Sequence, residues 1–226
     1  MTPRIAYGAF SYDLAHLLGA AVLVLSFALL YQRRITSIIG FYAVQSVLLA
    51  VAAAWQGWVQ DSTHLYITAL IAFAAKGVAI PVALRNIVFR LRIERSVDAA
   101  LGVFPTMALG VGLATLSILV VLPTTVESQT LTREDLALAL SVVMLGLLSM
   151  ITRRSAITQV IGFMSMENGL ILAAVGLPGM PLVVELSVAV LVMVAFVVFG
   201  VFFFRIRDQF DSLDVSHLDR VGGTHR

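Results

Sequence analysis

The feature that most constrains the fold is a series of long apolar stretches, each separated from the next by a few polar residues. A helix needs about 20 apolar residues to cross the hydrocarbon core of a bilayer, because each residue adds about 1.5 Å. We expect such helices at residues 11–31, 35–56, 64–88, 99–122, 134–152, 155–176 and 180–205. The sequence therefore predicts an all-α integral membrane protein with about seven transmembrane helices.

Composition supports this class and argues against several others. Hydrophobic residues make up 60% of the chain and charged residues 12%, about half the charged share of a soluble domain. The net charge of +2 offers no basic surface for nucleic acid. The chain has no cysteine, and its four histidines are scattered, so we expect no disulfide framework, no metal site and no cofactor. A retinal-binding protein is excluded because the last predicted helix contains no lysine.

The arginines predict the orientation of the chain. Positive residues collect on the cytoplasmic side of membrane proteins. With the N-terminus outside, the outer side holds only Arg4 and Arg133, and the inner side holds Arg33, Arg34, Arg85, Arg90, Arg92, Arg95, Arg153, Arg154, Arg205, Arg207, Arg220 and Arg226. No basic segment precedes the first apolar stretch, so we expect a retained helix and not a signal peptide. We therefore expect a multi-pass protein of the cell inner (plasma) membrane with a cytoplasmic C-terminus.

An internal repeat predicts how the helices are organised. Residues 35–46 (ITSIIGFYAVQS) align with residues 157–168 (ITQVIGFMSMEN) at a constant offset, which places Gln45 opposite Glu167. We expect a first three-helix unit at 1–98, a linker helix and outer loop at 99–133, a second three-helix unit at 134–207, and a polar cytoplasmic tail at 208–226. The first to third helices thus repeat as the fifth to seventh, joined by the fourth. Both units then face the same way, unlike the inverted repeats of many secondary transporters.

Lys76 is the only lysine in the chain, and it lies near the centre of the third predicted helix. A lysine at mid-membrane costs about 2.5–3.5 kcal/mol to insert, so its presence there points to a function. Snorkelling to an interface is the alternative, but each end of the helix is roughly 18 Å away. Pro81 cannot donate a hydrogen bond to the carbonyl of Gly77, which predicts a kink and a free backbone acceptor beside the ammonium group.

Glu167 is the acidic residue at the middle of the sixth predicted helix, and Asn168 follows it. An ionised carboxylate alone in lipid is costly, so we expect it to face the helix bundle or a partner subunit. With Lys76 it is a candidate proton relay, because the titrations of a closely spaced pair in low dielectric are coupled. Gln45 and Asn168 are candidates for the relay or for polar packing between helices.

The polar residues near the helix ends are less specific. Glu185, close to the start of the seventh predicted helix, is a third relay candidate, although a carboxylate in a first turn is also favoured by the helix dipole. Asp13 and His16, one turn apart at the outer end of the first helix, either interact with each other or form a hydrated helix start.

Residues 153–169 (RRSAITQVIGFMSMENG), followed by a second acidic helix, resemble the K-type membrane subunit of complex I. A further set of motifs extends over nearly the whole chain: Gly40-Phe41-Tyr42-Ala43, Gln45-Ser46, Lys76 with Pro81, Ala83 and Arg85-Asn86, Gly162 with Met166-Glu167-Asn168-Gly169, and Leu213-Asp214-Val215 with Leu218. In this order they resemble the hydrogenase-4 component E family more closely. In the K-type subunit the first glutamate follows the matching glycine by two residues, whereas Glu167 follows Gly162 by five. The carboxyl therefore keeps a similar helix face but is displaced by about 4.5 Å along the axis.

The resemblance implies a subunit without cofactors, not catalytic alone, packed between antiporter-like membrane subunits of a group 4 hydrogenase or complex I-like assembly with a hydrophilic redox arm. Its ionisable residues would contribute to proton or sodium translocation coupled to electron transfer. Two alternatives stay open at this stage: a cation antiporter subunit or stand-alone ion transporter that binds an ion with the same residues, and a scaffold subunit that only anchors others.

Overall fold

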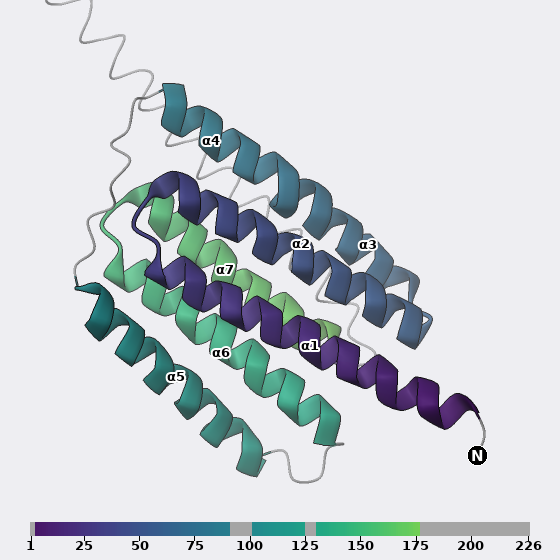
Figure 1. Cartoon of the computed structure of the whole chain (residues 1–226). Coiled ribbons are helices and arrows are strands. Elements are labelled where there is room, and N and C mark those ends of the chain that lie inside the picture. Colours follow the sequence, from purple (N-terminus) through teal and green to yellow (C-terminus); the bar gives the residue numbers. More distant parts are fainter. Residues whose placement is uncertain (1–2, 91–100, 125–129, 177–226) are drawn as a thin grey trace, which may run out of the picture. The chain divides into compact units, whose positions relative to one another are not determined.

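The computed structural model describes residues 3–90, 101–124 and 130–176, with side chains placed at 13–89, 101–121 and 134–176. Every element in these ranges is a helix (Figure 1). The elements are α1 (Pro3–Tyr31), α2 (Ile35–Gln60), α3 (Thr63–Ile71), the π-helix η1 (Ala72–Ala79), α4 (Ile80–Arg90), α5 (Val103–Thr124), α6 (Thr130–Thr152) and α7 (Ala156–Val175). The predicted all-α class is confirmed. The predicted seventh span at 180–205 and the polar tail lie outside the described residues.

Six segments of the described chain are long and apolar enough to cross a membrane. They are Asp13–Tyr31, Ile35–Gln60, Thr63–Phe89, Val103–Val121, Glu134–Thr152 and Ala156–Val175. These segments match the first six predicted spans to within a few residues. A membrane helix must satisfy every backbone N–H and C=O within itself, so hydropathy predicts such spans well.

The two central helices of the bundle are α2 and α6. α2 packs against α1, α7 and the continuous segment α3–η1–α4, and α6 packs against α1, α5 and α7. In Figure 1 α1 and α6 run in the same direction, and α2 and α7 both run in the opposite direction. These directions are those that a parallel repeat requires, but the division into two three-helix units stays a prediction.

The turn between α2 and α3 falls later than the sequence predicts. The expected connection began at Gly57, yet α2 continues to Gln60 and is closed by Asp61, which adopts the left-handed conformation (φ 50°) and donates its N–H to the carbonyl of Gly57. Aspartate tolerates this conformation better than most residues. Gly57 has a packing role instead, because a Cβ there would lie 3.3 Å from the Cβ of Leu65 on α3.

The third span is not a single kinked α-helix, as Pro81 predicts, but contains the π-helix η1 just before that proline. The N–H of Ile80 donates to the carbonyl of Ala75, five residues earlier. Since Pro81 has no N–H, the regular α-helical pattern cannot continue through it, and the wider π turns lie immediately before it. Lys76 and Gly77 are both part of η1.

Glycines bring α6 and α7 unusually close together. A Cβ on Gly146 would lie 2.5 Å from the backbone nitrogen of Met166, and a Cβ on Gly162 would lie 2.9 Å from that of Met150. A Cβ on Gly169 would lie 2.8 Å from the backbone nitrogen of Val143. In lipid, helix association depends on such close packing of small residues. This contact fixes the rotation of α7, and with it the direction of the polar residues on its other faces.

Candidate functional site

Lys76 is buried inside the bundle. It lies midway along the span Thr63–Phe89, about 20 Å from either end, and only 2% of its side chain is exposed. It is part of η1, which packs against α2, and its Nζ atom reaches Glu167 and Asn168 on α7. The ammonium group is therefore enclosed by helices near the middle of its span.

The partner of Lys76 is Glu167 on α7. The Nζ atom lies 2.9 Å from Oε1 of the carboxylate, and the Glu167 side chain is 3% exposed. Apart from this ion pair, neither carboxylate oxygen has a hydrogen-bond partner in the part of the chain that the structure describes. The two residues thus meet within one chain as a nearly dry ion pair, the arrangement in which charges in low dielectric interact most strongly.

Asn168 connects this pair to α2. Its Oδ1 accepts a hydrogen bond from Lys76 Nζ at 3.1 Å. Its Nδ2 donates to Ser46 Oγ at 3.2 Å and, more weakly, to Gln45 Oε1 at 3.4 Å. Asn168 and Gln45 are both fully buried. The two residues that the sequence offered as relay or packing groups therefore belong to the same polar cluster as the ion pair.

The cluster extends to α1 through two serines that the sequence analysis did not single out. Gln45 Nε2 donates to Ser26 Oγ at 2.7 Å and to Ser165 Oγ at 3.0 Å. Ser26 in turn donates to the carbonyl of Val22 at 2.9 Å. Serine is common in membrane helices, so neither position carried a signal beyond its place near Gln45 or Glu167. A continuous set of hydrogen bonds thus joins α1, α2, α7 and η1.

Tyr42 lies one turn from Gln45 and Ser46 on α2 and is fully buried. Its hydroxyl interacts electrostatically with Ser46 and Glu167 but makes no hydrogen bond of good geometry with any described residue. A buried tyrosine hydroxyl normally has a partner, so Tyr42, like the Glu167 carboxylate, has spare hydrogen-bonding capacity. The sequence contained it only as part of the Gly40-Phe41-Tyr42-Ala43 motif.

Arg153 connects α6 to the end of α1 at the arginine-rich end of the bundle. Although it follows the end of α6, only 4% of it is exposed, and its Nη2 donates to the carbonyls of Leu29 and Leu30 at 2.9 and 3.0 Å. These carbonyls belong to the last turn of α1, where backbone donors become scarce; the carbonyl of Leu29 also accepts the N–H of Gln32 at 3.3 Å. Burial, aided by nearby Arg33, lowers the pKa of the Arg153 guanidinium. Arg153 and Arg154 lie in the turn between α6 and α7, here called the arginine turn, and Arg153 thus has a structural role in it.

His16 has a different partner from the one that the sequence offered. Its Nδ1 lies 3.2 Å from Oδ1 of Asp135, and its Nε2 lies 3.9 Å from Glu134. The described contacts of His16 are therefore with the first turns of α6, across the interface between α1 and α6, and not with Asp13. Glu185, the third relay candidate, lies outside the described residues. Among the residues described, no group of three His, Cys, Asp or Glu side chains is placed to hold a metal.

Comparisons with known proteins give distant relatives. The chain is 28% identical to hydrogenase-4 component E of Escherichia coli over 186 residues, which covers 81% of this chain and 86% of the relative. It is 27% identical over 203 residues to an uncharacterised protein of Mycobacterium tuberculosis, covering 88% and 92% of the two chains. No protein-family profile matches the sequence, and no solved structure matches it. The chain is thus a distant homologue of hydrogenase-4 component E.

Proposed function

We propose that this protein is a non-redox membrane subunit of a hydrogenase-like or complex I-like assembly, and that Lys76 and Glu167 carry protons (or exchange them for sodium) within it. The observation that carries the proposal is the ion pair of 2.9 Å between two side chains that are almost completely buried at mid-membrane. Ionisable groups at that depth are expensive and usually functional. Here they are also paired, which is the condition for a charge to persist there.

The short distance within the pair supports a proton-exchanging role. Transfer of one proton from Nζ to Oε1 turns the ion pair into a neutral amine and a carboxylic acid without changing the net charge, so neither state leaves an isolated charge in lipid. Any further proton must arrive from or leave to another group. Asn168, Gln45 and Ser165 supply neighbouring donors and acceptors that can orient water for that step.

The multi-subunit setting rests on the distant relative, whose name describes one component of a hydrogenase. Large apolar side chains project outward from the third span, among them Tyr66, Leu70 and Phe73, and from α5, among them Phe104 and Leu119. In the proposed assembly these two outer spans face lipid or antiporter-like subunits, and the redox chemistry takes place in a separate hydrophilic arm. Plasma-membrane location with a cytoplasmic C-terminus is part of the same proposal.

The test uses native membranes and two matched carboxyl-to-amide changes. Glu167→Gln is expected to assemble, to leave electron transfer intact and to abolish coupled ion uptake into inverted vesicles. Asp61→Asn is the control, because Asp61 lies in an exposed turn and asparagine also accepts its left-handed backbone. Unchanged ion uptake in Glu167→Gln would contradict the proposal and support a scaffold subunit. Ion transport by the purified chain alone would instead support a stand-alone transporter.

A further inference from the structure

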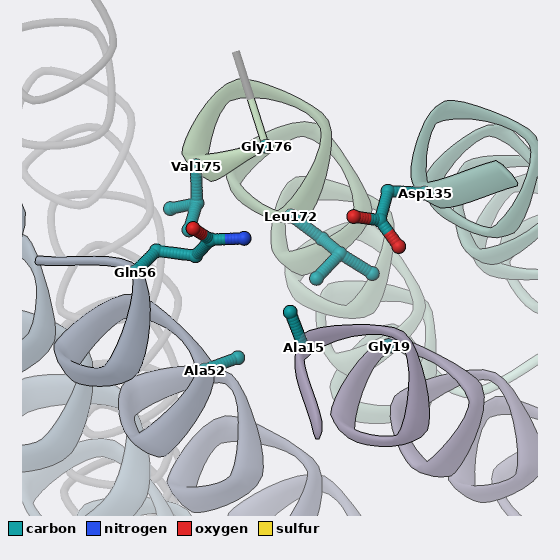
Figure 2. A pocket seen from close by; sticks show the side chains of 8 residues that line it. All are labelled: Ala15, Gly19, Ala52, Gln56, Asp135, Leu172, Val175 and Gly176. Atoms are coloured by element: carbon teal, nitrogen blue, oxygen red, sulfur yellow. The ribbon is translucent and has the colours of Figure 1, made fainter. Parts of the chain in front are cut away.

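A hollow opens between α1, α2, α6 and α7 at the end of the bundle opposite Arg153 (Figure 2). The Asp135 carboxylate and the Gln56 amide lie on its walls, Ala15 and Gly19 leave space on the α1 side, and Leu172 lies at its inner end. It offers about 10 Å³ to water centres, which is room for about one molecule. The hollow is lined mainly by apolar side chains, and the Asp135 carboxylate and the Gln56 amide are the polar side chains in its lining that can bind a water molecule there.

Three titratable side chains lie in or next to this hollow. Asp135 lines it directly, and its Oδ1 lies 3.2 Å from Nδ1 of His16, with Glu134 3.9 Å from the other ring nitrogen. The side chains of His16 and Glu134 are 43% and 56% exposed, whereas that of Asp135 is 21% exposed. Asp135 is therefore the carboxylate that connects the exposed histidine to the interior of the hollow.

The hollow and the polar cluster around Gln45 and Asn168 lie on the same helices α1, α2 and α7, the hollow nearer the end of the bundle. Next to the hollow is an apolar layer of Val22, Leu49 and Leu172, which are 0%, 0% and 7% exposed and belong to one packed cluster; Leu172 also lines the hollow. One turn further inward are the residues Ser26 on α1, Gln45 on α2 and Asn168 on α7. From Gly19 to Ser26 on α1, and from Ala52 to Gln45 on α2, about 10.5 Å of helix separates the hollow from the polar cluster.

We propose that this hollow is the water-filled access site through which protons pass between the Lys76–Glu167 pair and the membrane face at the start of α6, and that Asp135 is its proton-exchanging group. The layer of Val22, Leu49 and Leu172 is the seal, closed in this structure. This inference rests on the proposed function, to which it adds the route and the face.

The proposed step moves only a proton and needs no reactant other than water. A proton released by Glu167 or Lys76 crosses the layer on water, joins the Asp135 carboxylate, and leaves to bulk water as hydronium; uptake is the reverse. His16 accepts or donates the same proton across its 3.2 Å contact with Asp135. Apolar constrictions that admit water only transiently are a known way to gate a membrane pathway.

The experiment exploits the absence of cysteine from the chain. Single variants Gln56→Cys (hollow), Leu49→Cys (seal), Ser62→Cys (the α2–α3 turn) and Arg154→Cys (the arginine turn) are treated with a membrane-impermeant thiol reagent in right-side-out and in inverted membrane vesicles. Gln56→Cys is expected to react only in the orientation in which Ser62→Cys reacts, at a rate within about tenfold of it, because thiol reactivity follows access to water. Leu49→Cys is expected to stay unreactive, and to become reactive in a Leu172→Ala background.

Thiol labelling tests the access site, and ion uptake in Glu167→Gln tests the proposed function, so either can fail without the other. A Gln56→Cys thiol that reacts from neither face, or from the face of Arg154→Cys, overturns the access site even where Glu167→Gln abolishes ion uptake. Leu49→Cys that stays unreactive in Leu172→Ala overturns the seal. Where the labelling is as expected, Asp135→Asn must also slow ion uptake while electron transfer continues. Intact uptake in Asp135→Asn, or in Glu167→Gln, shows a water-filled hollow without a role in transport and overturns the proposal.

Discussion

The side-chain oxygen of Asn168 accepts a hydrogen bond from Lys76 Nζ at 3.1 Å, while the residue before it on α7 supplies the carboxylate that pairs with the same ammonium group. Consecutive residues on a helix point about 100° apart, so Lys76 lies in the angle between the two side chains. Asn168 also donates to α2. The ammonium position is therefore fixed both by a charge and by a neutral amide that belongs to a wider polar cluster.

The first prediction concerns the charge balance of the pair. Lys76→Met leaves the Glu167 carboxylate buried without a counter-charge and is expected to destabilise the protein by about 3–5 kcal/mol. The double variant Lys76→Met with Glu167→Gln should recover most of that stability, because neither buried charge remains. Thermal melting of the detergent-purified protein, followed by size-exclusion fluorescence, measures both. Losses that simply add in the double variant would show that the two side chains do not interact.

Asn168 gives a second prediction. Asn168→Leu removes the acceptor for Lys76 and the donor to Ser46, and is expected to cost about 2–3 kcal/mol because buried partners are left unsatisfied. The control is Gln60→Leu, which removes an amide that bonds to Val175 and Gln56 at the end of the bundle, where water can replace it. Equal melting temperatures for the two variants would contradict the dry setting of Asn168.

The α6–α7 contact gives a third prediction. Gly146→Ala places a methyl group 2.5 Å from the Met166 backbone nitrogen, so the helices must separate at a cost of about 1–3 kcal/mol. Gly112→Ala on α5 is the matched control, because a Cβ there meets nothing within 4 Å, and alanine is the better helix former. A melting temperature lowered in the first variant and unchanged or raised in the second is the expected pattern. The reverse order would show that the helices do not meet at Gly146.

The arginine turn gives a fourth prediction. Arg153→Gln loses two charge-assisted bonds to the last turn of α1 and is expected to lower stability by about 2 kcal/mol. Arg154→Gln removes the same charge from the next position, which is exposed, and should change the melting temperature little. Protein level in native membranes provides an independent readout. Similar losses in both variants would mean that charge at this face, and not the bonds to α1, is what matters.

Hydropathy predicted the described spans because lipid leaves a chain few alternatives to long helices. Lys76 and Glu167 were identified from the sequence because charged residues at the middle of a membrane span are rare. Their meeting was not predictable, because it depends on the rotation of α7, which the glycine contacts with α6 determine. Whether they paired within one chain or across two was left open by the sequence.

Other parts of the site were beyond sequence reasoning for similar reasons. For His16 the sequence offered either a contact with Asp13 on the same helix or a hydrated helix start, but His16 pairs with Asp135 across a helix interface that no local pattern reveals. Ser26 and Ser165 resemble any serine in a membrane helix. Pro81 predicted a disturbance in the third span, but not that it takes the form of a π-helix.

The π-helix η1 packs more residues into a given axial length than an α-helix does. The extra residues of its wider turns could shift along the third span while the two ends of the span stay in place. Movement of this surplus past Lys76 by a single residue would rotate the ammonium group by about 100° around the axis. A small exchange of backbone hydrogen bonds in η1 would therefore be enough to turn the ammonium group of the only lysine in the chain relative to Glu167.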